Sequence, residues 1–541
     1  MTSPFLTLEG VSHVLPDGST LFRELNEQFD QRPTGLVGRN GVGKTMLARL
    51  LAGQVQPTTG RCARSGSVHY LSQHLSPAPD ITVAGLAGVQ ATLDALERIE
   101  AGSSEVEDFE AVGERWDIRA RLQHALDRAG LTYLDARTPA SALSGGEAMR
   151  VALIGAFLSD TDFLILDEPS NHLDRPSRQA LIAQLQQWTR GLLVVSHDRQ
   201  LLETMARIVE LSSLGLRSYG GNYGFYAQCK ALELQNAQQQ LEQRKLERQR
   251  EERSLQEQRE GLERRQARGN RRAQDANQAK VLLGRQKERS EGSAGKLRQQ
   301  QAASRERLTQ RVCEAAQQVE DNMAITVHAL PVVSPSQRRI AELENVELPF
   351  VSGATRTISL MLTGQQRVGV VGPNGCGKST LLKVLARQLQ PLSGSCQVFV
   401  EGFYLDQRLS NLAPQRTVLE QMLAANRAAT EGELRMRLAQ LGLDAQKITV
   451  PSGSLSGGER LKAALACVLY AAPPAQLLLL DEPSNHLDLA SVQALEVMLS
   501  GYRGALVVVS HDEAFLEGVG LTHRLAVAED GGGLEDLEQG G

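Results

Sequence analysis

Short apolar runs and segments of helical periodicity alternate in two separate parts of the chain. In each part, the apolar runs have the length of buried strands, and an amphipathic helical pattern follows one of them directly. The first part has strands at 5–8, 35–38, 163–167 and 192–195 and a helix at 46–52. The second has strands at 340–343, 367–372, 477–481 and 506–509 and a helix at 381–386. This alternation predicts an α/β fold with mostly parallel sheets covered by helices.

Matching motifs in the two parts indicate an internal duplication. The pattern Gly-x-x-x-x-Gly-Lys-Thr/Ser ends at Lys44-Thr45 and again at Lys378-Ser379, 334 residues later. The interval from lysine to a following glutamine, Gln73 or Gln407, is 29 residues in both parts. Two such sets in matched register predict two copies of one nucleotide-binding machine.

Each glycine-rich loop lies between a predicted strand and a predicted helix. There, consecutive main-chain N–H groups and the helix dipole favour phosphate, and the lysine adds charge at the β- and γ-phosphates. The threonine or serine hydroxyl suits Mg²⁺. We therefore predict ATP and Mg²⁺ as ligands. The predicted ATP-binding residues are Gly38, Asn40, Gly41, Val42, Gly43, Lys44 and Thr45, with Gly372, Asn374, Gly375, Cys376, Gly377, Lys378 and Ser379.

Acidic and histidine side chains follow the later strands of each copy. Asp167 and Asp481 end apolar strands and can reach the metal. The next residue in each copy is a glutamate, which can act as base toward an attacking water. A Ser-His-Asp sequence follows the next strand, but adjacent residues cannot converge as a serine-hydrolase triad. The predicted catalytic residues are Glu168, Glu482, His197 and His511.

Composition is typical of a multidomain globular protein. The chain has 541 residues, 41% of them hydrophobic, and no apolar run long enough to span a membrane. The first residues lack the basic and apolar regions of a secretion signal. The six cysteines are scattered, as is usual for reduced thiols. These features predict a cytoplasmic protein.

The segment 226–325 differs in composition from both copies. It is rich in Gln, Arg, Glu, Lys and Ala, which predicts a charged helical hairpin turning near 269–270 or within 284–295; a flexible linker is the alternative. Residues 230–311 hold 21 Lys and Arg against 12 Asp and Glu, and the centre is the most basic. Without aromatic residues there, backbone contacts to folded RNA are favoured over base stacking. The predicted RNA-binding residues are Arg264, Arg265, Arg268, Arg271, Arg272, Lys280, Arg285, Lys287 and Arg289.

A Leu-Ser-Gly-Gly-Glu element occurs in each copy, at 143–147 and 455–459. With it, both copies resemble ATP-binding cassette (ABC) nucleotide-binding domains. The resemblance implies that Ser-Gly-Gly of one cassette closes over ATP held by the other, pairing Lys44 with Ser456 and Lys378 with Ser144. It adds as ATP-binding residues Ser144, Gly145, Gly146, Ser456, Gly457 and Gly458. The metal residues it implies are Thr45, Gln73, Asp167, Ser379, Gln407 and Asp481.

Both copies also carry Glu-Pro-Ser-Asn-His-Leu-Asp, at 168–174 and 482–488. With two fused cassettes and a charged linker, the chain resembles the ABC-F subfamily of soluble tandem ATPases. The resemblance implies ATP hydrolysis driving cassette closure, and ribosomal RNA and tRNA as partners, with the hairpin reaching from the ribosomal E site toward the P-site tRNA. It also implies a monomer with paired cassettes and no membrane subunit. The domains expected are cassettes at 1–225 and 326–528, a linker at 226–325 and a disordered acidic tail at 529–541.

The chain departs from the family pattern in two places. No aromatic residue for adenine stacking is evident near 13–15, whereas Phe350 is available in the second copy. The first copy also has 22 extra residues around 91–116, resembling a short arm insertion whose acidity argues against RNA contact. A transporter subunit or nucleic-acid repair ATPase is the alternative function. The motifs do not separate a translation factor from an antibiotic-resistance protein.

Overall fold

The computed structural model describes most of the chain. The described residues are 4–73, 80–171, 173–275, 302, 306–312, 337–351, 356–406, 409–485, 487–527 and 533–536. They form two compact units, one of Met1–Tyr226 with Ala324–Gly541 and one of Ala227–Met323. Both sets of motifs lie in the first unit, so the division into four domains stays a prediction.

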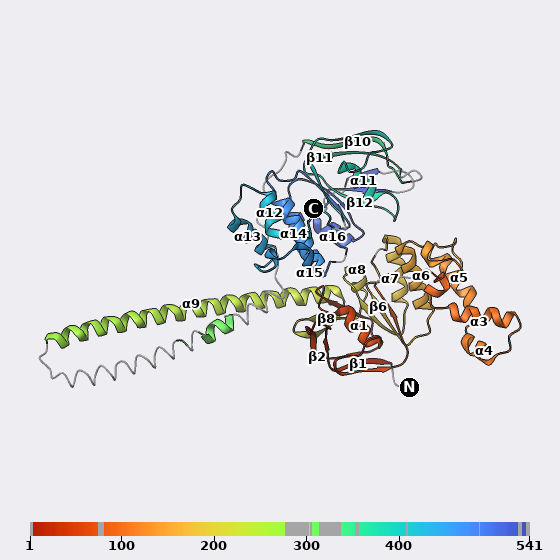
Figure 1. Cartoon of the computed structure of the whole chain (residues 1–541), viewed down its shortest axis with the longest axis horizontal. Helices are drawn as coiled ribbons and strands as arrows, with labels where there is room; N and C mark the ends of the chain where they lie inside the picture. Colours follow the sequence, from red (N-terminus) through yellow and green to blue (C-terminus); the bar gives the residue numbers. More distant parts are fainter. Residues whose placement is uncertain are drawn as a thin grey trace. The chain divides into compact units, whose positions relative to one another are not determined.

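A six-stranded sheet forms the centre of the first cassette (Figure 1). Its strand order is β5 (Val68–Leu71), β6 (Phe163–Asp167), β7 (Gly191–Val195), β3 (Thr34–Gly38), β8 (Arg207–Ser212) and β9 (Gly215–Gly220). All neighbours are parallel except β8 and β9. Every residue of β6 and β7 is buried, as expected for strands covered on both faces. The predicted parallel sheet is confirmed.

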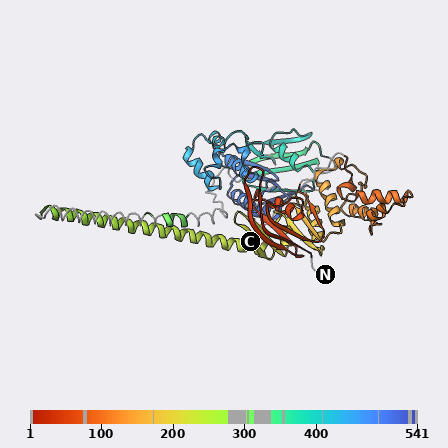
Figure 2. The same cartoon turned by 60° about the horizontal axis from the view of Figure 1, so that its bottom comes forward.

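A second, antiparallel sheet packs against the phosphate-loop helix of this cassette. It has the order β2 (Thr20–Phe29), β1 (Phe5–Val14) and β4 (Thr59–Ser65) and is seen from another side in Figure 2. Leu6 and Phe29 from this sheet join Leu47 of helix α1 (Lys44–Ala52) in one buried core. This core holds the helix that follows the first glycine-rich loop.

The second cassette repeats this architecture. Its large sheet has the order β14 (Gly402–Leu405), β15 (Leu477–Asp481), β16 (Ala505–Val509), β12 (Arg367–Val371), β17 (His523–Ala526) and β18 (Gly533–Asp536). Its small sheet has the order β11 (Thr357–Thr363), β10 (Arg339–Glu347) and β13 (Ser393–Val398). The expected disordered tail is wrong for β18, which pairs antiparallel with β17. Main-chain hydrogen bonds at a sheet edge form without an apolar sequence.

Corresponding helices follow the strands in both cassettes. The first cassette has α6 (Gly145–Leu158), α7 (Arg175–Gln186) and α8 (Arg199–Glu203). The second has α11 (Lys378–Leu385), α14 (Gly457–Leu469), α15 (Leu489–Ser500) and α16 (Glu513–Val519). Helix α2 (Val83–Leu86) of the first cassette and α12 (Val418–Ala425) of the second both follow a threonine N-cap, and α13 (Glu431–Gln440) comes next in the second cassette.

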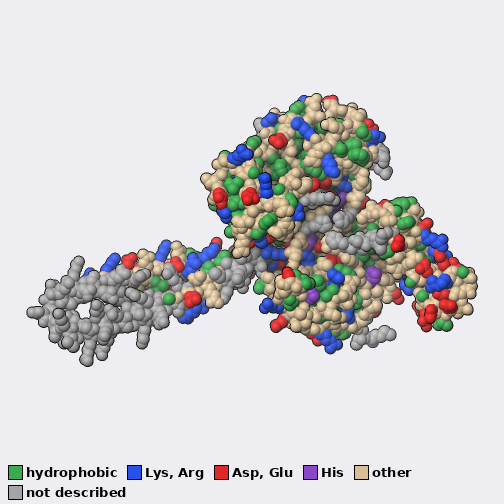
Figure 3. Space-filling view, in the orientation of Figure 1, with side chains coloured by type: hydrophobic (Ala, Val, Ile, Leu, Met, Phe, Trp, Pro, Cys, Tyr) green, Lys and Arg blue, Asp and Glu red, His purple; other side chains and the backbone are tan. Residues whose placement is uncertain are grey.

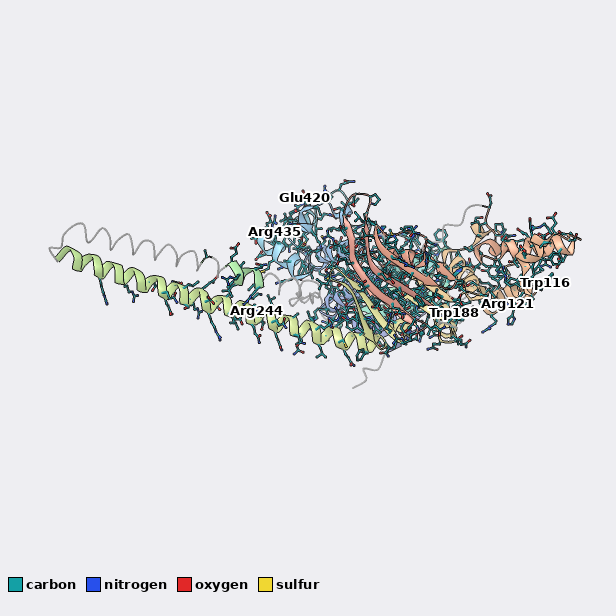
Figure 4. All side chains as sticks on the ribbon, turned by 90° about the horizontal axis from the view of Figure 1, so that it is seen from below. Trp116, Arg121, Trp188, Arg244, Glu420 and Arg435 are labelled. Atoms are coloured by element: carbon teal, nitrogen blue, oxygen red, sulfur yellow. The ribbon has the colours of Figure 1, made fainter. Side chains whose placement is uncertain are left out.

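The 22 extra residues of the first cassette lie in a region that is mostly helical. They lie within α3 (Gln90–Glu100), α4 (Val106–Val112) and the turn before α5 (Ile118–Arg128). Acidic side chains gather on α3 and α4 in the space-filling view (Figure 3), and Trp116 lies near the outer end of this projection (Figure 4). Arg98 and Asp108 pair within it at 2.6 Å. The predicted acidity of this surface is confirmed, whereas the absence of RNA contact stays a prediction.

Helix α9 (Tyr223–Asp275) begins at the end of the first cassette. It makes up most of the charged segment that the structure describes. Its sequence pairs charges one turn apart, as in Arg244–Glu247 and Arg248–Glu252, and Arg244 projects from it in Figure 4. The predicted charged helix is confirmed. It runs through 269–270 without interruption, so a turn there is wrong, because one glycine costs a helix only about 1 kcal/mol. The other predicted turn, within 284–295, lies outside the described residues.

Candidate functional site

The two glycine-rich loops have matching geometry. Gly43 and Gly377 precede α1 and α11 with φ of 104° and 99°, a left-handed conformation that favours glycine. The Nζ of Lys44 donates to the carbonyl oxygen of Gly38 at 2.8 Å, and Lys378 does the same to Gly372 at 2.8 Å. The lysine of each loop therefore closes that loop on itself. The helix that follows begins at this lysine, so its N-terminus lies beside the lysine ammonium group.

The cavity around the lysine of each glycine-rich loop is lined by the predicted acidic and histidine residues. The first cavity is about 480 Å³ in volume, and its lining includes Lys44, Thr45, Gln73, Asp167, Glu168 and His197. The second is about 550 Å³, and its lining includes Lys378, Ser379, Asp481, Glu482 and His511. The structure therefore brings these predicted residues together at both sites. Gln407 lies outside the described residues.

The glutamates adopt an unusual backbone conformation. Glu168 and Glu482 have φ of 51° and 49°, in the left-handed region, where residues other than glycine are strained. Their amides donate to the carbonyl oxygens of Val195 at 2.8 Å and Val509 at 2.9 Å. These main-chain bonds join the end of one strand to the next and hold the backbone of each glutamate in place.

Each glutamate lies beside the histidine of its own cassette. The Nε2 of His511 is 3.4 Å from Oε1 of Glu482 and 3.2 Å from Oδ1 of Asn374. At the first site, Nε2 of His197 is 3.6 Å from Oε1 of Glu168. Burial lowers the pKa of His197 to about 3 and that of His511 to about 4, so both imidazoles are neutral near pH 7.

Burial also changes the protonation of the glutamates. It raises the pKa of Glu168 to about 8 and that of Glu482 to about 7, against the attraction of Lys44 and Lys378. A carboxylate that titrates near neutral pH is suited to accept a proton from water. The arrangement can therefore supply a general base at each site.

Oxygen groups suitable for Mg²⁺ lie beside these glutamates. The Oγ of Ser379 donates to Oδ1 of Asp481 at 3.0 Å, so a hydroxyl and a carboxylate meet at one point. The described residues contain no cluster of three or more His, Cys, Asp and Glu side chains that could hold a metal. This donor set fits Mg²⁺, which prefers oxygen ligands and retains water or phosphate oxygens. Ser379 and Asp481, with Thr45 and Asp167 at the first site, would hold it, and the ion would neutralise phosphate charge.

Two further pairs at the sites were missed by the sequence reasoning. The hydroxyl of Tyr404 donates to Oδ2 of Asp481 at 3.0 Å, and that of Tyr70 donates to Asp167 at 3.1 Å. A tyrosine one residue before the end of a short strand in both copies was the available signal.

Asp174 and Asp488 were also missed, although both end the repeated Glu-Pro-Ser-Asn-His-Leu-Asp sequence. Each caps the following helix, and each also accepts from the glycine-rich loop of the other cassette. The amide of Asn40 donates to Asp488 at 2.9 Å, and the main chain of Asn374 hydrogen-bonds Asp174. Their recurrence in both copies was the signal.

The Ser-Gly-Gly elements begin helices with capping boxes. The Oγ of Ser144 accepts from the amide of Glu147, whose carboxylate accepts from the amide of Ser144, and Ser456 and Glu459 form the same box. Residues 144–146 line the cavity around Lys378, as the resemblance implies. Residues 456–458 are not among the lining residues of the described cavity around Lys44. That second pairing stays a prediction.

Most of the remaining predicted residues line the two cavities or belong to the charged segment, whereas Val42 and Cys376 pack in the hydrophobic cores of their cassettes. Asn40, Gly41 and Gly43 line the first cavity, and Asn374, Gly375 and Gly377 line the second, together with Phe350, whose side chain is 91% exposed. Of the RNA set, Arg264 and Arg268 are exposed on α9. Residues 265, 271 and 272 lie on α9 without described side chains, and 280, 285, 287 and 289 lie outside the described residues.

Comparison with known proteins agrees with this geometry. The ABC transporter family model matches residues 28–171 and 355–485, covering both sets of motifs. A tylosin resistance ATP-binding protein of Streptomyces fradiae is 32% identical and aligns over 94% of this chain and 95% of its own. The chain is an ABC-F protein. An energy-dependent translational throttle protein of Mycobacterium tuberculosis is likewise 32% identical, over 91% of this chain and 86% of its own.

Solved structures show the same tandem-cassette fold as this ABC-F chain. An archaeal ribosome recycling factor, crystallised with a ribosomal stalk protein, superposes with a TM-score of 0.58 over 98% of this chain and 91% of its own, at 17% identity. An RNase-L inhibitor gives a TM-score of 0.55 at 18% identity. Among the described residues, no helix has both the length and the apolar character needed to cross a membrane.

Proposed function

We propose that this ABC-F chain hydrolyses ATP at two sites formed between its cassettes. The observation that carries the proposal is the second cavity, where Lys378, Glu482 and His511 of one cassette face Ser144 of the other. Lys378 and the two helix N-termini would bind phosphate, and Glu482 would accept a proton from the attacking water. Glu168 and His197 would have the same roles at the first site.

ATP binding is proposed to hold the cassettes together, and hydrolysis to release them. The two glycine-rich loops already contact the opposite cassettes through Asp488 and Asp174. Phosphate between a loop and a Ser-Gly-Gly helix would add an anion shared by both cassettes, which favours the closed form. Mg²⁺ would be required as the partner of the nucleotide.

The ribosome is the proposed target of this cycle in the cytoplasm. Relatives of similar length are named for translational throttling and tylosin resistance, and the superposing structure is a ribosome recycling factor. The exposed Arg264 and Arg268 on α9 belong to a basic segment that would contact RNA phosphates. We propose that the chain acts there as a translation factor or in ribosome protection.

Steady-state hydrolysis with and without ribosomes tests the proposal. The wild-type chain should release phosphate from ATP, and ribosomes should change the rate. E168Q and E482Q should each retain one site, and the double variant should lose at least about 100-fold in kcat, as for loss of a general base. E110Q/E517Q, at two exposed glutamates, is the matched control. Undiminished hydrolysis by E168Q/E482Q would contradict the proposed sites.

Growth of a deletion strain separates the two ribosomal roles. Increased sensitivity to ribosome-targeting antibiotics would favour protection, whereas a growth or translation defect without a drug would favour a translation factor. Phenotypes that depend on the glutamates of both sites would connect either role to ATP turnover.

A further inference from the structure

Arg178 of the first cassette lies between the two candidate sites. It belongs to α7, and its side chain, which is 12% exposed, lines the cavities around both Lys44 and Lys378. A largely buried guanidinium needs partners for its charge and its N–H groups. Its partners identify what it holds in place.

Two contacts connect Arg178 to the histidine segments of both cassettes. Its Nη1 donates to the main-chain carbonyl oxygen of His511 at 2.9 Å. Its Nε is 3.1 Å from Oδ2 of Asp198, the residue after His197. The planar guanidinium holds these two directions rigidly, which a lysine ammonium cannot do. One side chain of the first cassette therefore holds the His511 segment of the second.

The corresponding position of the second cassette cannot make this connection. Arg178 lies four residues after Asp174, and the residue four after Asp488 is Val492. Val492 lines the cavity around Lys44 but has no hydrogen-bond donor on its side chain. The segment of His197 therefore has no counterpart of the Arg178 contact at this position, and the two sites differ.

We propose that Arg178 is a positioning residue for the second ATP site, holding the His511 segment from the opposite cassette and so making turnover there depend on the first cassette. This inference rests on the proposed ATP hydrolysis. The proposal predicts a difference between the sites: ATP turnover at the Lys378 site depends on Arg178 more than turnover at the Lys44 site does.

Single-site turnover tests this direction. R178A is combined with E168Q, which leaves the second site, and separately with E482Q, which leaves the first. In the E168Q background, kcat should fall about tenfold with the KM for ATP changing by less than about twofold. In the E482Q background, R178A should lower kcat only about twofold, which is a loss about fivefold smaller. Equal losses in both backgrounds, or no loss in either, would overturn the proposal.

Two variants separate positioning from general damage to the interface. R175A removes a neighbouring cross-cassette ion pair, Arg175 to Glu513 at 3.0 Å, and should leave the asymmetry unchanged. R178K retains the charge and should recover part of the rate lost in R178A.

Amide hydrogen exchange tests the contact without any turnover. In R178A, exchange in the peptide containing residues 510–513 should be at least about tenfold faster, and R175A should match wild type. Unchanged exchange in a folded R178A protein would overturn the proposal. An E168Q parent that fails to hydrolyse ATP would instead contradict the proposed function, and the exchange result would still decide the role of Arg178.

Discussion

Nε2 of His511 lies 3.4 Å from Oε1 of Glu482, and burial moves the pKa of the two groups in opposite directions. At neutral pH the imidazole is uncharged, and the carboxylate is close to its midpoint. The pair is therefore not held as an ion pair at this pH, and the carboxylate is the member that can accept a proton from water. His197 and Glu168 repeat the relationship at 3.6 Å.

The first prediction concerns pH. A general base must be ionised, so activity is low below its pKa and increases as the pH rises through it. The E168Q variant, which retains Glu482, should show an acidic limb near the pKa of about 7. The E482Q variant, which retains Glu168, should show its limb nearer to about 8. Measurement of kcat against pH tests these raised pKa values, and flat profiles, or limbs in the usual carboxylate range below about pH 5, would contradict them.

The second prediction concerns Ser144, which caps α6 and lines the cavity around Lys378. S144A should destabilise the cap by about 1 kcal/mol. S144R should in addition place a long side chain in the cavity and remove turnover at the second site, measured in the E168Q background. S144R should leave ATP bound at Lys44, read by a fluorescent nucleotide in the same protein. Full second-site turnover in S144R would contradict the composite site.

The third prediction concerns the ion pair between Arg199 and Glu496, which joins the cassettes at 2.8 Å with both side chains 14% exposed. E496A would leave the guanidinium buried without its partner, at a cost of about 3 kcal/mol. The more exposed pair of Arg175 and Glu513 should contribute about 0–1 kcal/mol. Thermal unfolding of E496A and R175A compares them. Equal Tm shifts would contradict a larger stability contribution from the buried pair.

The fourth prediction concerns the basic centre of the linker. Replacing Arg264, Arg265 and Arg268 with glutamine should weaken ribosome binding by about tenfold and reduce its dependence on salt, because phosphate contacts release counterions. The matched control replaces Arg244, Lys245 and Arg248, three basic residues on α9 outside the predicted RNA-binding set. Binding over a salt series tests this, and an equal loss in both variants would contradict a role specific to the centre.

Much of the fold could be predicted from the sequence because its signals are local. Buried strands such as 163–167 and 477–481 are continuous apolar runs, and the glycine-rich loops have a fixed spacing. The helix N-termini at Ser144 and Ser456 carry a capping-box signature. These features depend on neighbouring residues, so the pattern along the chain is sufficient.

Features that depend on distant residues were missed or wrong. Arg178 appears as an ordinary helix residue in the sequence, and only the approach of the second cassette gives it the carbonyl of His511 as a partner. Strand β18 forms by pairing with β17, which its acidic, glycine-rich sequence does not indicate. The turn expected at 269–270 has a local cause instead: the surrounding residues favour a helix strongly enough to include one glycine, so α9 continues there.

Co-sedimentation of the E168Q/E482Q variant with ribosomes tests the central claim most directly. This protein should bind ATP without hydrolysing it, and it should therefore accumulate on ribosomes with ATP and not with ADP. A K44A/K378A variant, which loses the phosphate contacts, should not accumulate under either condition. ATP-dependent accumulation of E168Q/E482Q is the result predicted by the account. Equal ribosome occupancy with ATP, with ADP and without nucleotide would contradict it.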